Sequence, residues 1–166
     1  MSIRARTAAA VARATGRASR ALGRGGGTAV PGHVLLRLDP RGIEHLSARI
    51  GGGSILVSAT NGKTTTTRLL AGALRTGGAP VVTNAAGANL LSGVATTLAE
   101  AGAALGAATR GAFEVDEAAL PAVAARIRPR AILLMNLFRD QLDRHGELEA
   151  IAARWEGMIG TLPSVT

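Results

Sequence analysis

Short apolar runs alternate with longer amphipathic stretches from residue 54 onward. The short runs predict buried strands, and the longer stretches predict helices. The predicted strands span 54–58, 80–83, 112–115 and 131–136, and the predicted helices span 63–76, 89–105, 117–127 and 146–159. Strands that alternate with helices in this way require βαβ crossovers, so the pattern predicts a parallel α/β sheet.

The segment before the first strand contains turn and cap signals of its own. Pro31 and Gly32 predict a turn. Asp39 is expected to cap the helix that follows, with Pro40 at its first position. That helix is expected to run to about Ile50, where three consecutive glycines end it.

The N-terminal segment differs from the rest of the chain in charge as well as pattern. Residues 3–23 predict a basic, alanine-rich helix, which the glycines at 23–27 end. Residues 1–38 carry +7 and residues 39–166 carry +1 of the net charge of +8. We therefore expect a basic helix with a glycine-rich linker over 1–38, followed by a domain over 39–166.

The uneven charge bears on the partners of the chain. Because residues 39–166 are nearly neutral, no nucleic-acid partner is expected. The alternatives for the basic segment over 1–38 are contact with an anionic membrane surface, contact with nucleic acid, and a solvated or partner-packed helix.

Composition narrows the class further. With 47% hydrophobic and 18% charged residues among 166, the chain is typical of a soluble globular protein. The absence of cysteine excludes disulfides and thiolate metal sites within these residues. Arginines interrupt every N-terminal apolar run, so no secretory signal is predicted and a cytoplasmic location is expected.

The strongest candidate site is the loop that follows the first predicted strand. This candidate phosphate loop (residues 59–65) reads Ala59-Thr60-Asn61-Gly62-Lys63-Thr64-Thr65. Small residues in a tight loop let backbone N–H groups point at a polyphosphate, and the positive end of the next helix adds to the attraction. Lys63 is placed to reach the β- and γ-phosphates, and the Thr64 hydroxyl to ligate Mg²⁺. The alternative is a Gly-Lys helix start that binds no ligand.

Lys63 is also the only lysine of the chain, whose other 18 basic residues are all arginine. A compact ammonium on a flexible stem is not interchangeable with a planar guanidinium, so the exception at this position favours a phosphate-binding role.

Thr-Asn-Gly-Lys-Thr-Thr after an apolar strand resembles the ATP-binding central domain of the Mur ligases and the related folylpolyglutamate synthases. Val57 stands where the general phosphate loop has glycine, and Ala59 stands where most members of the family have glycine. The methyl group of Ala59 restricts φ and adds bulk close to the phosphates. The resemblance implies nucleotide contacts at Thr60, Asn61, Gly62, Lys63, Thr64 and Thr65.

Two asparagines after the second predicted strand extend the resemblance. The segment contains Asn84 and the run Gly87-Ala88-Asn89-Leu90-Leu91-Ser92-Gly93. In Mur ligases an asparagine of this segment approaches the nucleotide phosphates, which implies nucleotide contacts at Asn84 and above all Asn89. Asn89 as a helix N-cap is an equally open alternative, and the two roles are compatible.

Acidic residues end the third predicted strand. A carboxylate at the carboxyl end of a parallel strand, beside a phosphate loop, is well placed to hold Mg²⁺. By resemblance Glu114 is the metal-binding glutamate of the family, and it joins Lys63 as a catalytic residue. Asp116 and Glu117 are expected to begin the next helix, where the helix dipole favours acids.

The segment after the fourth predicted strand narrows the resemblance to one branch. It reads Asn136-Leu137-Phe138-Arg139-Asp140-Gln141-Leu142-Asp143-Arg144-His145. Most Mur ligases have Asp-His-x-Asp here, and Gln141, a neutral oxygen donor, replaces the histidine that helps to hold their second metal. Together with the run at 87–93, this segment resembles the ligase subunit of lipid II isoglutaminyl synthase. His145 is expected to be a surface residue.

This resemblance implies an activity. In that family the ligase subunit uses ATP and Mg²⁺ to convert the α-carboxyl of D-glutamate in the lipid II stem peptide into an acyl phosphate. Ammonia from a glutaminase partner then displaces the phosphate. By resemblance Thr64, Glu114 and Gln141 hold the metal.

The resemblance covers roughly residues 20–160, which match only the first part of the family's chain. The adenine-contacting part, a four-cysteine Zn²⁺ ribbon and a C-terminal domain follow later in that chain. We therefore expect an incomplete central domain that is inactive as a ligase on its own. The alternatives are another Mur-type amino-acid ligase, a folylpolyglutamate-synthase-like ligase, or a non-catalytic ATP-binding fragment.

Overall fold

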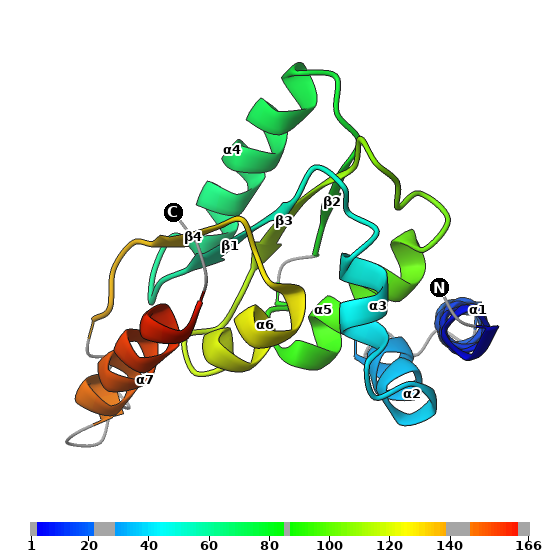
Figure 1. Ribbon diagram of the computed structural model, residues 1–166, viewed down its shortest axis with the longest axis horizontal. Helices are drawn as coiled ribbons and strands as arrows, with labels where there is room; N and C mark the ends of the chain where they lie inside the picture. Colours follow the sequence, from blue (N-terminus) through cyan, green and yellow to red (C-terminus); the bar gives the residue numbers. More distant parts are fainter. Residues whose placement is uncertain (1–2, 22–28, 85–86, 139–146, 163–166) are drawn as a thin grey trace.

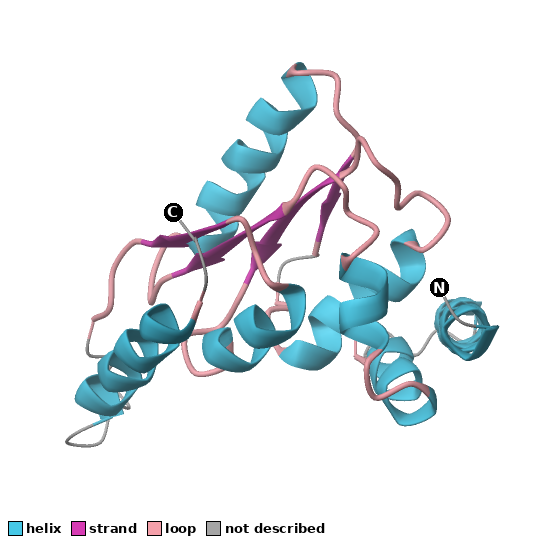
Figure 2. Ribbon diagram, viewed as in Figure 1, coloured by secondary structure: helices cyan, strands magenta, loops and turns pink. Residues whose placement is uncertain are grey.

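The computed structural model describes residues 3–21, 29–84, 87–138 and 147–162. Its four strands are β1 (Ser54–Ser58), β2 (Val81–Thr83), β3 (Arg110–Glu114) and β4 (Ala131–Leu134). They form one parallel sheet in the order β2-β3-β1-β4 (Figures 1 and 2). The predicted parallel α/β fold is thus confirmed, and β1 lies in the interior of the sheet.

Helices cover both faces of this sheet. They are α1 (Ile3–Ala21), α2 (Val30–Leu38), α3 (Gly42–Ser47), α4 (Lys63–Thr76), α5 (Leu91–Ala101), α6 (Leu120–Ile127) and α7 (Glu147–Thr161). Helix α4 packs on one face, and α5 and α6 lie on the other, with α1, α2 and α3 packed beyond them (Figure 1). Because both faces are covered, the strands can be almost wholly apolar.

The core is mostly aliphatic, and Phe113 of β3 is the largest of its fully buried side chains in the described ranges. Phe113, Leu56 of β1, Leu98 of α5 and Leu120 of α6 are all fully buried. Helix α7 joins this core through Trp155 and Met158, each only 7% exposed. The sheet and the helices packed on it therefore form a well-packed core that supports the loops at the carboxyl ends of the strands.

The turn predicted at Pro31 and Gly32 is wrong, because both residues lie in α2. Proline is tolerated in the first turn of a helix, where its missing N–H would have no intrahelical partner. Gly32 lies where α2 packs against α5, and a Cβ at this position would lie only 1.9 Å from the Ser92 carbonyl oxygen of α5. Its backbone N–H donates to Thr96 Oγ1 at 2.8 Å. The small residue thus lets two helices approach closely.

Asp39 does not begin the helix predicted after it. It ends α2, where its backbone N–H donates to the Leu35 carbonyl oxygen, and α3 begins only at Gly42. Its side chain instead accepts from the Arg41 N–H at 3.2 Å and lies 2.7 Å from His45 Nδ1. The buried carboxylate therefore fastens the α2–α3 turn.

The predicted basic helix is present as α1, which packs against α2 and α5. Its buried face consists of Ala5, Ala8, Ala9, Ala12 and Gly16. Arg20 Nη1 lies 2.5 Å from Glu100 Oε1 of α5. None of the helices in the described ranges combines the length and apolarity needed to cross a membrane. The division between 1–38 and 39–166 stays a prediction.

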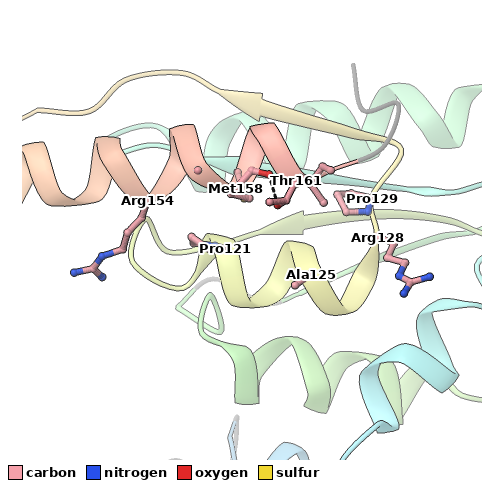
Figure 3. A pocket seen from close by; sticks show the side chains of 9 residues that line it. Pro121, Ala125, Arg128, Pro129, Arg154, Met158 and Thr161 are labelled. Atoms are coloured by element: carbon pink, nitrogen blue, oxygen red, sulfur yellow. Dashed lines mark hydrogen bonds between the residues drawn. The ribbon is translucent and has the colours of Figure 1, made fainter.

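A cavity of about 660 Å³ lies between α6 and α7. Pro121, Ala125 and Met158 line its middle, and the guanidinium groups of Arg128 and Arg154 extend away from the two helices (Figure 3). No residue of the candidate phosphate loop lines it. It is therefore separate from the candidate phosphate loop.

Candidate functional site

The candidate phosphate loop lies at the carboxyl end of β1 and leads directly into α4. Asn136, which follows β4, holds it in place. The Thr60 N–H donates to the Asn136 carbonyl oxygen at 3.0 Å, and the Asn61 N–H donates to Asn136 Oδ1 at 3.0 Å. Asn136 Nδ2 returns a bond to the Asn61 carbonyl oxygen at 3.1 Å. Asn136 had no predicted role; its only mark in the sequence is that it is a polar residue at the end of the apolar run 131–135.

Gly62 turns the loop into the helix. It has φ of +85°, the left-handed region that glycine occupies without strain, and it precedes the first residue of α4. No side chain in the described ranges caps the helix at Gly62, and the first N–H groups and positive dipole end of a helix attract an anion.

Lys63 begins α4, and its side chain folds back over the loop. Nζ donates to the carbonyl oxygens of Ala59 and Thr60, the latter at 3.3 Å. It also forms an ion pair with Glu117 Oε2 at 2.8 Å. The ammonium therefore lies between the start of the candidate phosphate loop and Glu117.

Thr64 and Glu114 meet beside this lysine. Thr64 Oγ1 donates to Glu114 Oε2 at 2.8 Å, across from α4 to the end of β3. Glu114 is only 5% exposed. A hydroxyl and a carboxylate are the hard oxygen donors that Mg²⁺ prefers, so this pair fits the metal implied by the resemblance. In the described ranges no three His, Asp or Glu side chains cluster as a metal site, so Mg²⁺ would need further ligands from its nucleotide or from water.

Asn84 is buried next to Glu114, and its side chain forms hydrogen bonds with backbone atoms. Its Nδ2 donates to the carbonyl oxygens of Ala88 and Glu114, each at 2.8 Å, and its Oδ1 accepts from the Glu114 N–H at 2.9 Å. It therefore connects the loop after β2 to the end of β3. Its predicted contact with nucleotide stays a prediction.

Asn89 lies nearby on the same loop and is partly exposed. Its carbonyl oxygen accepts from the Asp116 N–H at 3.0 Å, which places it next to the β3–α6 connection. The alternative role as helix N-cap is wrong, because α5 is preceded by Leu90 and has no side-chain cap. The Asn89 side chain makes no hydrogen bond to the residues that the structure describes, and its nucleotide contact stays a prediction.

Asp116 and Glu117 do not begin a helix, because α6 starts only at Leu120. Asp116 Oδ1 accepts from the Ala118 N–H at 3.0 Å, which makes a turn. Glu117 instead reaches Lys63, and its carbonyl oxygen accepts from Trp155 Nε1 of α7 at 2.9 Å. Helix-dipole reasoning placed these acids in the next helix and so missed the ion pair.

The remaining predicted residues are placed as follows. Thr65 is exposed on the first turn of α4. Gln141 and His145 lie outside the described residues, so the predicted metal contact of Gln141 stays a prediction.

Comparison with known proteins agrees with this geometry. The family model of the Mur ligase middle domain matches residues 57–163. A Streptococcus pneumoniae protein named lipid II isoglutaminyl synthase (glutamine-hydrolyzing) subunit MurT is 37% identical over 124 residues, covering 75% of this chain and 27% of its own length. MurT of Staphylococcus aureus is 32% identical over 143 residues, covering 86% of this chain and 32% of its own length.

Two solved structures share the fold. Crystal structures of MurF from Acinetobacter baumannii superpose with TM-scores of 0.58 and 0.59 at 16% and 17% identity. They cover 82% and 78% of this chain, and 28% of the MurF chain in each case. The chain thus spans roughly a third or less of the curated relatives and structures that it matches. From the match over residues 57–163 and the parallel sheet around the candidate phosphate loop, we conclude that the chain belongs to the Mur ligase family.

Proposed function

We propose that this chain forms the nucleotide-phosphate site of an ATP-dependent ligase that amidates lipid II. The observation that carries the proposal is the meeting of Lys63, Thr64 and Glu114 at the carboxyl end of β1, beside the free start of α4. Ligands of open α/β sheets bind at this end of the strands. The names of the MurT relatives support lipid II amidation as the reaction.

Different residues of the site would bind different parts of a triphosphate and its metal ion. The N–H groups at the start of α4 and the Lys63 ammonium neutralise and orient the phosphates. Thr64 and Glu114 would hold Mg²⁺, with Gln141 proposed as a further oxygen ligand. Thr60, Asn61, Gly62 and Thr65 shape the loop around the phosphates, and Asn89 and Asn84 border it. Bound ATP would supply the phosphoryl group that activates the carboxylate.

The acceptor proposed is the α-carboxyl of D-glutamate in the lipid II stem peptide. A glutaminase partner would supply ammonia, in line with the words "glutamine-hydrolyzing" and "subunit" in the relatives' names. Holding carboxylate, phosphoryl donor and amine together accounts for roughly 7–11 kcal/mol of the barrier in such reactions. The described residues provide the phosphate part of this arrangement.

Isothermal titration with ATP and Mg²⁺ tests the proposal. The 166-residue chain should bind ATP, Lys63→Ala should lose binding by at least tenfold while keeping its circular dichroism spectrum, and Lys63→Arg should weaken it too, because a guanidinium does not replace a compact ammonium. Equal affinity of wild type and Lys63→Ala would refute the phosphate site.

The amidation step needs its own assay. Adding the chain to a glutaminase, glutamine, ATP, Mg²⁺ and lipid II, with the product followed by mass spectrometry, separates the proposed ligase role from simple ATP binding. We expect ATP binding without amidation by the chain alone, and amidation when a MurT relative of the full length is used instead. Amidation by the chain at the relative's rate would contradict the expectation that it holds only part of the enzyme.

A further inference from the structure

The Lys63 ammonium has no donor to spare in this structure. An ammonium carries three N–H donors. Three acceptors surround Nζ: the carbonyl oxygens of Ala59 and Thr60, and Glu117 Oε2. The side chains of Lys63 and Glu117 are 13% and 14% exposed, so the ion pair is largely shielded from water. A phosphate oxygen can be bound only after one of the three acceptors leaves.

The three acceptors differ in charge and in origin. Ala59 and Thr60 belong to the candidate phosphate loop itself and are neutral. Glu117 belongs to the β3–α6 connection and is the only anion of the three. Exchanging Glu117 for an anionic phosphate oxygen leaves one counter-charge on the largely buried ammonium, whereas exchanging a neutral carbonyl for a phosphate would place two anions against it. Glu117 is therefore the acceptor that a phosphate replaces at the lowest cost.

We infer that Glu117 is the resting counter-ion of Lys63, a positioning residue that the terminal phosphates of a bound nucleotide displace. The inference rests on the proposed nucleotide site. It gives the two glutamates different roles: Glu114 accepts a hydrogen bond from Thr64 and would bind the metal, and Glu117 pairs with Lys63.

The backbone around Glu117 is fixed well enough for this role. Its carbonyl oxygen accepts from Trp155 Nε1 at 2.9 Å, and the turn that contains it is closed by the Ala118 N–H, which donates to Asp116 Oδ1. Glu117 is thus held within reach of Lys63 by contacts that do not involve the nucleotide. The side chain can then turn away when a phosphate arrives, without movement of the turn.

Two consequences follow for binding. The Lys63–Glu117 pair stabilises only the nucleotide-free state, so removing the carboxylate charge should tighten ATP binding. After displacement, the Glu117 carboxylate lies close to a polyphosphate of the same sign, and Mg²⁺ offsets part of that repulsion. The gain on removing the charge should therefore be larger when Mg²⁺ is absent.

The test compares Glu117→Gln with Asp116→Asn, the same change of charge one residue away at a side chain without a contact to Lys63. ATP affinity is measured by calorimetry with Mg²⁺ and again with EDTA. Glu117→Gln should bind ATP about tenfold more tightly with Mg²⁺ and still more tightly, relative to wild type, in EDTA. Asp116→Asn should stay within about twofold. Unchanged or weaker binding by a folded Glu117→Gln would overturn the inference.

Lysine acylation gives a second readout that needs no nucleotide. Because Lys63 is the only lysine, a small amine-reactive reagent modifies no other side-chain ammonium, and peptide mass spectrometry gives its rate. Glu117→Gln should raise this rate severalfold over wild type, and Asp116→Asn should not. Glu117→Asp, which keeps the charge on a shorter side chain, should fall between wild type and Glu117→Gln.

The two readouts distinguish the inference from the proposed function. If wild type fails to bind ATP, the proposed function fails, and the acylation rates still decide whether Glu117 restrains Lys63. If ATP binds and is lost in Lys63→Ala, but Glu117→Gln changes neither affinity nor acylation, the proposed function stands and the inference is wrong.

Discussion

Asn84 offers a perturbation whose size can be worked out from the structure. The side chain is 8% exposed and makes three hydrogen bonds, two to Glu114 and one to Ala88. A net contribution of about 1 kcal/mol for each bond gives a loss of about 3 kcal/mol for Asn84→Ala. Since a domain of this size is typically stable by about 5–15 kcal/mol, such a loss is large but does not prevent folding.

Urea unfolding measures this loss, with the fluorescence of Trp155, the only tryptophan, as the signal. The matched control is Asn89→Ala, the same substitution on the same loop, where the side chain makes no hydrogen bond within the described ranges and the change should stay within about 0.5 kcal/mol. Asn84→Ala should also weaken ATP binding, because Glu114 loses its support. Equal stabilities of the two variants would show that Asn84 does not fasten β3, and would refute the reasoning.

Two further predictions rest on single contacts, and a third rests on the exposed charge of α1. Gly62→Ala should destabilise the folded protein by about 1–2 kcal/mol, because φ is +85° and the new Cβ lies 3.3 Å from Met135 Cε. Gly72→Ala, at a position of α4 where a Cβ meets open space, should stabilise the folded protein. Thermal melts compare the two variants, and equal shifts in melting temperature would contradict the account. Trp155→Phe should lose about 1 kcal/mol with its bond to Glu117, measured by circular dichroism; an unchanged melting temperature would contradict that bond. We also propose that the exposed Arg6 and Arg17 of α1 bind anionic membranes. Replacing both with glutamate should abolish co-sedimentation with phosphatidylglycerol vesicles, whereas Arg68→Glu on α4 should not. Equal binding by wild type and both variants would exclude α1 as the membrane-binding segment.

The sheet could be predicted from the sequence because its signal is local. The run 54–58 has the predicted bounds, and 131–136 ends two residues earlier as Ala131–Leu134. Short apolar runs between longer amphipathic stretches have few other ways to bury their side chains. The loop from Ala59 to Thr65 could be placed for the same reason, since it joins one such run to a helix.

Three of the features that were missed depend on contacts between distant segments. Pro31 and Gly32 have turn composition, but Gly32 is needed where α2 meets α5. Glu117 has the composition of a helix start, but its partner Lys63 lies 54 residues away. Asn136 is likewise paired with Asn61 across 75 residues. Local propensity carries no information about such partners, and only the sheet order brings them together.

Acyl transfer from an acyl-phosphate derivative of ATP tests the central claim most directly. Such a probe places a reactive acyl group at the end of the triphosphate and passes it to a nearby amine, and Lys63 is the only lysine that can receive it. If the candidate phosphate loop binds the triphosphate, peptide mass spectrometry should find the acyl group on Lys63, and excess ATP with Mg²⁺ should suppress it. Absence of the acyl group from Lys63, or labelling that excess ATP leaves unchanged, would contradict the account.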